Sequence, residues 1–387
     1  MADDLLARYL RPGTLQLGAP PPLGLYIHLP WCLRKCPYCD FNSHEAATGG
    51  HPEARYLDAL RADLEAALPM VWGRHVQTIF IGGGTPSLFS PEGIERLLAD
   101  VRALLPLTPG CEITLEANPG TFERERFRAF RAAGVTRLSI GVQSFDDAKL
   151  QALGRVHSRA QALAAAEEAH DAFDTFNLDL MYALPGQTLA EAAADLRTAL
   201  ALAPPHLSVY HLTIEPNTVF ANRPPPALPD DDLASEMLDQ ITALTGAAGM
   251  ARYEVSAYAR PGHRCAHNLN YWQFGDYLGL GAGAHSKLSF PHRVVRQVLS
   301  HRSPRAANEV MPTACRNDTP RNGRCHRRVM RSAAARHHVT PNGVNANTDF
   351  VKYPSATATP ASTAKRHFRL SLVRTMAHVA RVFQNAS

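Results

Sequence analysis

The chemistry that this sequence suggests begins with three cysteines within eight residues: Cys32, Cys36 and Cys39. Three thiolates at this spacing can each bind one iron of a [4Fe–4S] cube, which leaves the fourth iron without a protein ligand and open to chelation by a small molecule. A zinc site with His44 as a fourth ligand is the alternative, although no second Cys-x2-Cys pair follows. The chain has seven cysteines, and an odd number with three packed together favours a metal or redox site over disulfides.

Alternating strand-like and helix-like runs between about residues 24 and 216 must position this loop. The strand-like runs are 24–30, 76–84, 111–119, 135–144, 176–185 and 206–216, and helix-like runs include 56–68, 91–105, 121–134 and 189–202. Within these, Thr121 is a predicted helix cap and Gly134 a predicted helix stop. Six strand–helix units in series predict a parallel sheet, which right-handed crossovers can curl into a barrel or partial barrel. Beyond them we expect a helix at 231–249 and a strand at 252–260.

Polar and glycine residues follow most of these predicted strands. The cysteines follow the first, GGGTPS (82–87) the second, EANPG (116–120) the third, and Gln143 and Ser144 the fourth. In a βα barrel these positions share the C-terminal face, where chemistry is placed. The coincidence predicts a functional site at that face.

Composition narrows the class of protein. The chain has 387 residues, of which 45% are hydrophobic, which is enough for a sizeable core. No run of about 18 apolar residues is present, and the acidic start MADDLLARYLRPG does not resemble a secretory signal. We therefore expect a cytoplasmic protein.

The segment YIHLPWCLRKCPYCDFNSH (26–44) resembles the cluster loop of radical S-adenosylmethionine (SAM) enzymes. More narrowly, it is similar to the oxygen-independent coproporphyrinogen III oxidases and their relatives, the HemW-type heme chaperones. The resemblance covers about residues 20–297 and continues through GGGTPS, EANPG, GVQSF (141–145), LGRVH (153–157), NLDLMYALPGQT (177–188), HNLNYW (267–272) and GLGAGAH (279–285). It implies an α/β fold, a radical-SAM partial (β/α)6 TIM-like barrel with a C-terminal extension.

The resemblance also implies a chemistry and a set of site residues. A reduced cluster donates one electron to the sulfonium of SAM, which splits into methionine and a 5′-deoxyadenosyl radical. SAM itself chelates the open iron. Cysteines 32, 36 and 39 are the implied metal ligands. The implied cofactor-binding residues are Tyr26, Tyr38, Gly83, Gly84, Thr85, Glu116, Gln143, Arg155, Asp179 and His267.

Within that set, the resemblance gives different positions different roles. Gly83, Gly84 and Thr85 form a strand end that the methionyl amine approaches, and Glu116 holds the ribose or the amino group of SAM. Gln143, Arg155 and Asp179 match positions that bind a second SAM in the oxidases. Taken from the residues alone, GGGTP could be a plain turn and each of the polar residues an ordinary surface or salt-bridged side chain.

Two departures separate the oxidases from the chaperones. Phe41 stands where the oxidases typically carry a fourth cysteine, and the stretch before Tyr26 is shorter than in the oxidases. The motif HNxxYW supplies His267, an imidazole suited to be an axial ligand of heme iron, with aromatic neighbours able to stack on a porphyrin. A structural histidine in an aromatic cluster, or Cys265 as a softer ligand, are the alternatives.

The resemblance therefore implies a heme chaperone that delivers heme to acceptor proteins, with a membrane-bound respiratory enzyme as a candidate acceptor. The runner-up is an oxygen-independent coproporphyrinogen III oxidase, which decarboxylates two propionates of its substrate. Four segments are expected: a lead at 1–19, a radical SAM core at 20–220, an accessory segment with the HNxxYW motif at 221–297, and a tail at 298–387.

The tail departs from the body in composition. Residues 299–387 hold 15 Lys+Arg against 3 Asp+Glu, although the whole chain has a formal net charge of only +5. A basic block invites a nucleic-acid interpretation. No aromatic interleaving or recognisable binding module accompanies it, so no nucleic-acid partner is expected. The abrupt loss of periodicity near residue 298 instead indicates a disordered or frame-shifted tail that replaces the C-terminal domain of the family, with Cys315 and Cys325 ligating nothing.

Overall fold

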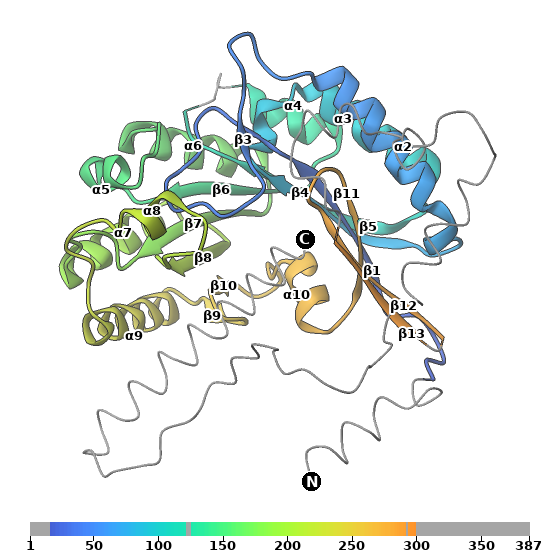
Figure 1. The fold of residues 1–387 in the computed structure, drawn as a ribbon. Coiled ribbons are helices and arrows are strands. Elements are labelled where there is room, and N and C mark those ends of the chain that lie inside the picture. The colour runs from blue at the N-terminus through green and yellow to red at the C-terminus, as the bar shows by residue number, and fades with distance from the viewer. Residues whose placement is uncertain (1–15, 121–124, 292, 299–387) are drawn as a thin grey trace, which may run out of the picture.

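The computed structural model describes residues 16–120, 125–291 and 293–298. Its main feature is an 11-stranded sheet in the order β13-β12-β11-β1-β4-β5-β6-β7-β8-β10-β9. The seven central strands are parallel: β11 (Asp276–Leu280), β1 (Leu23–Leu29), β4 (Val76–Gly83), β5 (Leu107–Ala117), β6 (Arg137–Gln143), β7 (Phe176–Tyr182) and β8 (His206–His211). The sheet curves strongly, with helices on its outer face (Figure 1).

Antiparallel strands extend both edges of the sheet, so the curved sheet stays open as a partial barrel. On one side β12 (His285–Phe290) and β13 (Arg293–Val298) follow β11, and on the other β10 (Ala257–Ala259) and β9 (Ala251–Arg252) follow β8. A separate pair, β2 (Trp31–Cys32) and β3 (His44–Glu45), brackets the cysteine loop.

Helices connect the parallel strands and cover the convex face of the sheet (Figure 1). The longer ones are α2 (Glu53–Val71), α3 (Pro91–Leu104), α4 (Arg126–Ala133), α6 (Arg159–Ala172), α7 (Leu189–Ala201) and α9 (Asp231–Ala247). Shorter elements are η1 (Pro86–Leu88), α5 (Asp147–Ala152), α8 (Val219–Asn222) and α10 (Ala266–Trp272). Side-chain caps begin several of them, including capping boxes at Ser158 and Thr188.

The alternation of side chains along each strand separates the core from the interior of the barrel. On β4, Ile79 and Ile81 are fully buried in the main hydrophobic cluster together with leucines of α2 and α3. Thr78 and Phe80, which alternate with these isoleucines along the strand, contact groups on the other face, among them His267 of α10. The outer face therefore stabilises the fold, and the concave face carries polar and aromatic groups.

The expected α/β partial barrel and its six strand positions are confirmed. The seventh parallel strand, β11, lies beside β1 although about 250 residues separate them in the sequence. The expected strand at 252–260 is two short strands, and helix α6 was not expected. Gly134, with φ 109°, ends α4 as predicted, whereas the predicted cap Thr121 lies outside the described residues.

Strands β9 to β13, which follow residue 220, join the same sheet as the core strands. The division of the chain at residue 220 stays a prediction. Residues 1–15 and 299–387 lie outside the described ranges. The second of these ranges contains nearly all of the basic tail and both of its cysteines. The frame-shift hypothesis therefore stays a prediction. Within the described ranges, no helix combines the length and apolar character needed to cross a bilayer.

Candidate functional site

The cysteine loop is shaped by its own backbone and by one lysine. His44 N donates to Pro30 O at 2.8 Å and so brings the end of the loop back beside its start. Lys35 Nζ lies inside the loop and donates to the carbonyl oxygens of Phe41, at 2.9 Å, and Ser43, at 3.1 Å. These backbone and lysine contacts close the cysteine loop.

All three thiols of this loop are free and partly exposed. Burial raises the pKa of Cys32, and it raises that of Cys39 to about 11, with a partly compensating contact from Ser43 in each case. Within the described residues, no three His, Cys, Asp or Glu side chains converge on one metal position. A cube differs from a single ion because each thiolate binds a different iron, so the sulfurs stand apart.

The donor set therefore fits a cube better than a mononuclear zinc ion. His44 Nε2, the fourth ligand that zinc would need, lies 3.1 Å from Asn42 Oδ1. Zinc ligands in structural sites converge tetrahedrally on one ion. The free thiols of one short, preformed loop are instead compatible with three separate irons.

The glycine turn at the end of β4 packs directly on this loop. Gly83 has φ 119°, and a Cβ there would lie 2.7 Å from the His28 ring. A Cβ on Gly84 would lie 2.6 Å from the carbonyl oxygen of Trp31. Thr85 N donates to the same Trp31 oxygen at 2.7 Å. Only glycine permits this approach, so the turn presents bare backbone beside the cysteines.

Arg155 links the cysteine loop to the ends of β5 and β6. Its Nη1 donates to Cys36 Sγ at 3.5 Å, and its Nη2 donates to Gly141 O at 2.7 Å and to Asn118 Oδ1. Asn118 Nδ2 in turn donates to Thr85 Oγ1 at 2.8 Å. A small hollow is lined by Cys36, Thr85, Asn118 and Arg155 among others. The buried Arg155 Nε has no hydrogen-bond partner in the described part of the chain, as a site for an anionic ligand group requires.

Two carboxylates lie near each other, and one of them, Asp179, also lies near Arg155. Glu116 Oε2 accepts from Gly83 N at 3.1 Å, and Asp179 accepts from Asn177 Nδ2 at 2.7 Å and from Ser139 Oγ at 3.2 Å. Burial and repulsion from Asp179 raise the pKa of Glu116 to about 8, and burial raises that of Asp179 to about 6. A cationic amine would stabilise both charges. The free thiols, bare backbone, unpartnered Arg155 Nε and carboxylates together fit a cluster with SAM.

The two tyrosines of the predicted site lie in different places. Tyr26, on β1, is 5% exposed; its hydroxyl donates to His28 Nδ1 at 3.0 Å, and its ring stacks on Phe80. Tyr38 lies in the cysteine loop, with its ring 6.4 Å from that of Phe220 on α8. Tyr26 therefore forms part of the inner wall, while Tyr38 packs the loop against α8.

His267 lies away from the strand ends, on the concave face and towards the opposite end of the barrel. It is 1% exposed, with Nδ1 2.8 Å from Thr78 Oγ1 and Nε2 2.9 Å from Tyr271 Oη. Burial lowers the pKa of His267 to about 3. Both ring nitrogens are thus engaged, so a heme iron could bind His267 only after one of these two hydrogen bonds is broken. Contact between His267 and heme stays a prediction, because neither ring nitrogen is available to a heme iron in this conformation.

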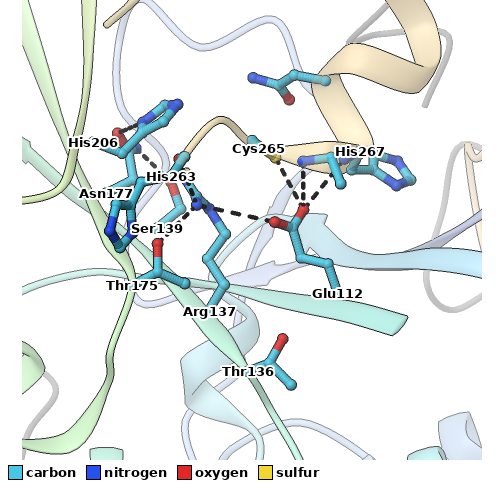
Figure 2. Close-up of polar contacts among 12 residues, drawn as sticks. Glu112, Thr136, Arg137, Ser139, Thr175, Asn177, His206, His263, Cys265 and His267 are labelled. Atoms are coloured by element: carbon cyan, nitrogen blue, oxygen red, sulfur yellow. Dashed lines mark hydrogen bonds and ion pairs between the residues drawn. The ribbon is translucent and has the colours of Figure 1, made fainter. Parts of the chain in front are cut away.

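Figure 2 shows what holds α10 in that place. Glu112 Oε1 accepts from Ala266 N at 2.9 Å, His267 N at 3.2 Å and Cys265 Sγ at 3.4 Å. Glu112 Oε2 lies 4.0 Å from Nη1 of Arg137, which is 2% exposed. Cys265 therefore serves as a donor to Glu112, and Cys111 is a buried residue of the hydrophobic core.

The structure brings together most of the predicted residues: the three cysteines, Tyr38, Gly83 to Thr85, Glu116, Gln143, Arg155 and Asp179. Sequence reasoning missed Asn118, which joins Thr85 to Arg155. It also missed Asn42, whose Nδ2 donates to Ala282 O at 2.8 Å and ties the cysteine loop to the turn after β11. Asn118 lies within the EANPG motif, at a strand end, and that position was the available signal.

Comparison with known proteins agrees with this geometry. Residues 26–199 match the model of the radical SAM superfamily. The heme chaperone HemW of Escherichia coli is 55% identical over 286 residues, which are 74% of this chain and 75% of that protein. The protein of the same name from Bacillus subtilis is 39% identical over 265 residues, 67% of this chain and 69% of the relative.

The fold has a close counterpart among solved structures. Coproporphyrinogen III oxidase (HemN) from Escherichia coli, a radical SAM enzyme, superposes with a TM-score of 0.63 at 24% identity, over 81% of this chain and 83% of that one. At that identity the likeness shows the fold alone. From the sequence relatives and the superfamily match together, the chain belongs to the radical SAM superfamily and, within it, to the family of the heme chaperone HemW.

Proposed function

We propose that this chain is a heme chaperone, which binds heme and transfers it to acceptor proteins. The observation that carries the proposal is the 55% identity over 286 residues to a relative with that name. Membership of the radical SAM superfamily implies a [4Fe–4S] cluster and SAM. Heme as cargo, and a membrane-bound respiratory enzyme as one acceptor, are parts of the proposal.

We assign the cluster to Cys32, Cys36 and Cys39, which are free thiols of one preformed loop. When bound, the cluster supplies an electron to the sulfonium of SAM. The Arg155 guanidinium, which donates to Cys36 Sγ, stabilises negative charge on that sulfur. The positive charge of Arg155 also lies between the cysteine loop and the C-terminal end of β6, where it attracts an anionic ligand group.

The remaining residues are assigned to SAM. Bare backbone at Gly83 and Gly84, with Thr85 and Tyr26 beside it, supports the methionyl end, and Glu116 accepts from its amino group or ribose. Gln143, Arg155 and Asp179 are assigned to a second SAM. Tyr38 packs the cysteine loop against α8 and lies beside Cys36 and Arg155, so it is assigned to the same cofactor site.

The oxidase alternative is less favoured. The sequence relatives carry the name of the chaperone, and the oxidase is a fold-level likeness at 24% identity. Phe41 occupies the place of the fourth cysteine of the oxidases, and it is 41% exposed beside the cluster loop. A direct assay with coproporphyrinogen III, SAM and reductant separates the two functions, because a chaperone yields no protoporphyrinogen.

Heme transfer tests the proposal. Anaerobically reconstituted full-length protein is loaded with heme and mixed with a heme-free acceptor, and the Soret band of each is followed after separation. We expect heme to move to the acceptor faster than free heme at the same concentration would supply it. A protein that binds no heme, or that holds heme without releasing it to any acceptor, would contradict the proposal.

The role of His267 is tested within the same assay. His267→Gln keeps a side chain able to bond Thr78 or Tyr271 but removes the imidazole. His206→Gln is the matched control, because His206 is also 1% exposed with both ring nitrogens engaged, by Asn177 and Tyr253. Weaker heme binding in the His267 variant alone supports heme contact. Equal binding in both variants assigns His267 a structural role.

A further inference from the structure

The turn that ends β6 is strained at a residue of the candidate site. Ser144 N donates to Val142 O at 2.9 Å, which closes a three-residue turn around Gln143, whose φ is 68°. A γ-turn with positive φ is rare and strained when its central residue carries a side chain. The register of β6 on β7 also shifts between Gly141 and Gln143. Such strain persists only where surrounding contacts enforce it.

The group that enforces the turn is a buried carboxylate of α7. Asp195 Oδ2 accepts from Ser144 Oγ at 2.6 Å, and its Oδ1 accepts from Phe145 N at 2.7 Å. Asp195 is 7% exposed, and Ser144 and Phe145 are fully buried. His157 Nε2, 2.9 Å from Val142 O, holds the other side of the turn. Asp195 thus acts from the outer layer of the barrel on a turn at its open end.

The strained turn places the Gln143 amide among the ligand-facing groups. A Cβ added to Gly141 would lie 2.9 Å from Gln143 Nε2, 2.7 Å from Asn118 Oδ1 and 3.3 Å from Arg155 Nη2. The three polar groups therefore crowd around the bare α-carbon of Gly141. Among the described residues no hydrogen bond engages the Gln143 amide. The unfavourable backbone conformation of Gln143 is therefore not offset by a hydrogen bond of its own side chain.

We propose that Asp195 is a positioning residue for the second SAM, the molecule assigned to Gln143, Arg155 and Asp179. Through Ser144 and Phe145 it holds the strained turn at Gln143, and it thereby sets the Gln143 amide beside Arg155 for contact with bound SAM. The inference rests on the proposed contact of SAM with Gln143 and Arg155. It assigns a role to a side chain that lies on a helix outside the sheet and does not itself line the site.

The test compares SAM affinity and stability in anaerobically reconstituted full-length variants. Asp195→Ala is expected to weaken binding of the second SAM about tenfold, as for one lost hydrogen bond to the ligand, and to leave the change that the first SAM produces in the electron paramagnetic resonance spectrum of the reduced cluster as in the parent. Asp195→Asn keeps one oxygen for Phe145 N–H and should restore most of the affinity. Ser144→Ala, a milder change, should lose about threefold.

A double-mutant cycle separates positioning from general destabilisation. Gln143→Gly removes both the side chain and the strain, because glycine adopts positive φ freely, so adding Asp195→Ala should then cost no further SAM affinity. Asp276→Asn is the control: this carboxylate is fully buried and bonded to Arg74, Lys287 and Ser289. It should lower the melting temperature and leave SAM affinity unchanged.

The positioning role would be overturned if the losses of SAM affinity from Gln143→Gly and Asp195→Ala were additive in the double variant. It would also be overturned if both Asp195→Ala and Ser144→Ala bound SAM with the affinity of the parent. A loss of SAM affinity in Asp276→Asn as large as in Asp195→Ala would overturn it too. Parent protein that holds its cluster but binds no SAM would contradict the proposed function itself, and the inference would fall with it.

Discussion

Glu116, near the end of β5, accepts a hydrogen bond from the backbone N–H of Gly83 at 3.1 Å, so a partly buried carboxylate and a left-handed glycine meet at the C-terminal ends of the strands. The contact couples the electrostatics of the inner face to the shape of the glycine turn. Each partner can be perturbed separately, because one contributes a charge and the other a backbone conformation.

The glycine of this contact is irreplaceable on steric grounds. Gly83→Ala should lower the free energy of unfolding by about 1 to 3 kcal/mol, because alanine disfavours φ 119° and its Cβ would meet the His28 ring. Urea denaturation measures the change. Gly246→Ala is the control: Gly246 lies in α9 with open space around it, so alanine should stabilise the protein by about 0.5 to 1 kcal/mol. Equal effects of the two variants would refute the steric account.

The carboxylate should make stability depend on pH. The pKa of Glu116 rises from 4.5 to about 8 in the folded protein, so the folded state binds more protons than the unfolded state between these values. The contribution of Glu116 is therefore greatest below about pH 4.5 and is lost as the pH rises to about 8. Glu116→Gln, which stays neutral, should remove this part of the pH dependence. Parallel stability–pH curves for parent and variant would contradict the prediction.

The cluster assignment predicts that replacing a cysteine of the loop removes the cluster, whereas replacing a cysteine elsewhere does not. Single changes of Cys32, Cys36 or Cys39 to alanine should lose the iron, the acid-labile sulfide and the brown chromophore after anaerobic reconstitution. Cys111→Ala, at a buried core position, should retain all three. Iron and sulfide analysis measures the outcome. Full iron and sulfide in the loop variants, or equal losses in all four, would remove the assignment.

The contacts of Glu112 predict an unusual gain of function. Glu112→Ala removes an acceptor shared by three donors of the α10 segment and should destabilise the protein by about 1 to 3 kcal/mol. If His267 binds heme only when α10 is released, the same variant should bind heme about three- to tenfold more tightly, because the competent state is more populated. Heme titration followed by Soret absorbance measures it.

The control for this gain is Glu254→Ala. Glu254 accepts from the backbone N–H and hydroxyl of Ser256, so its loss also destabilises the protein without touching α10. Its heme affinity should stay at the parental value. A Glu112 variant that binds heme no better than the control would show that α10 does not limit heme access.

Local features of the sequence determined the cluster loop, the alternation of strands and helices, and the strand-end positions of most site residues. These follow from short-range spacing: three thiols share one loop, and parallel strands must bring their C-terminal ends to one edge. For this reason the residue order alone is enough to place Glu116 and the glycines at one end of the barrel, whereas Arg155 was placed there only by the family resemblance.

Only the tertiary structure decided what depends on contacts between distant segments. It added β11 beside β1, brought Asn118 between Thr85 and Arg155, and set Asp195 behind the turn at Gln143. It also buried His267 with both nitrogens engaged, an arrangement that matches the structural alternative and that the HNxxYW motif alone could not separate from heme ligation. A motif specifies residue types and spacing, whereas burial and hydrogen-bond partners are set by whichever strands and helices pack against it.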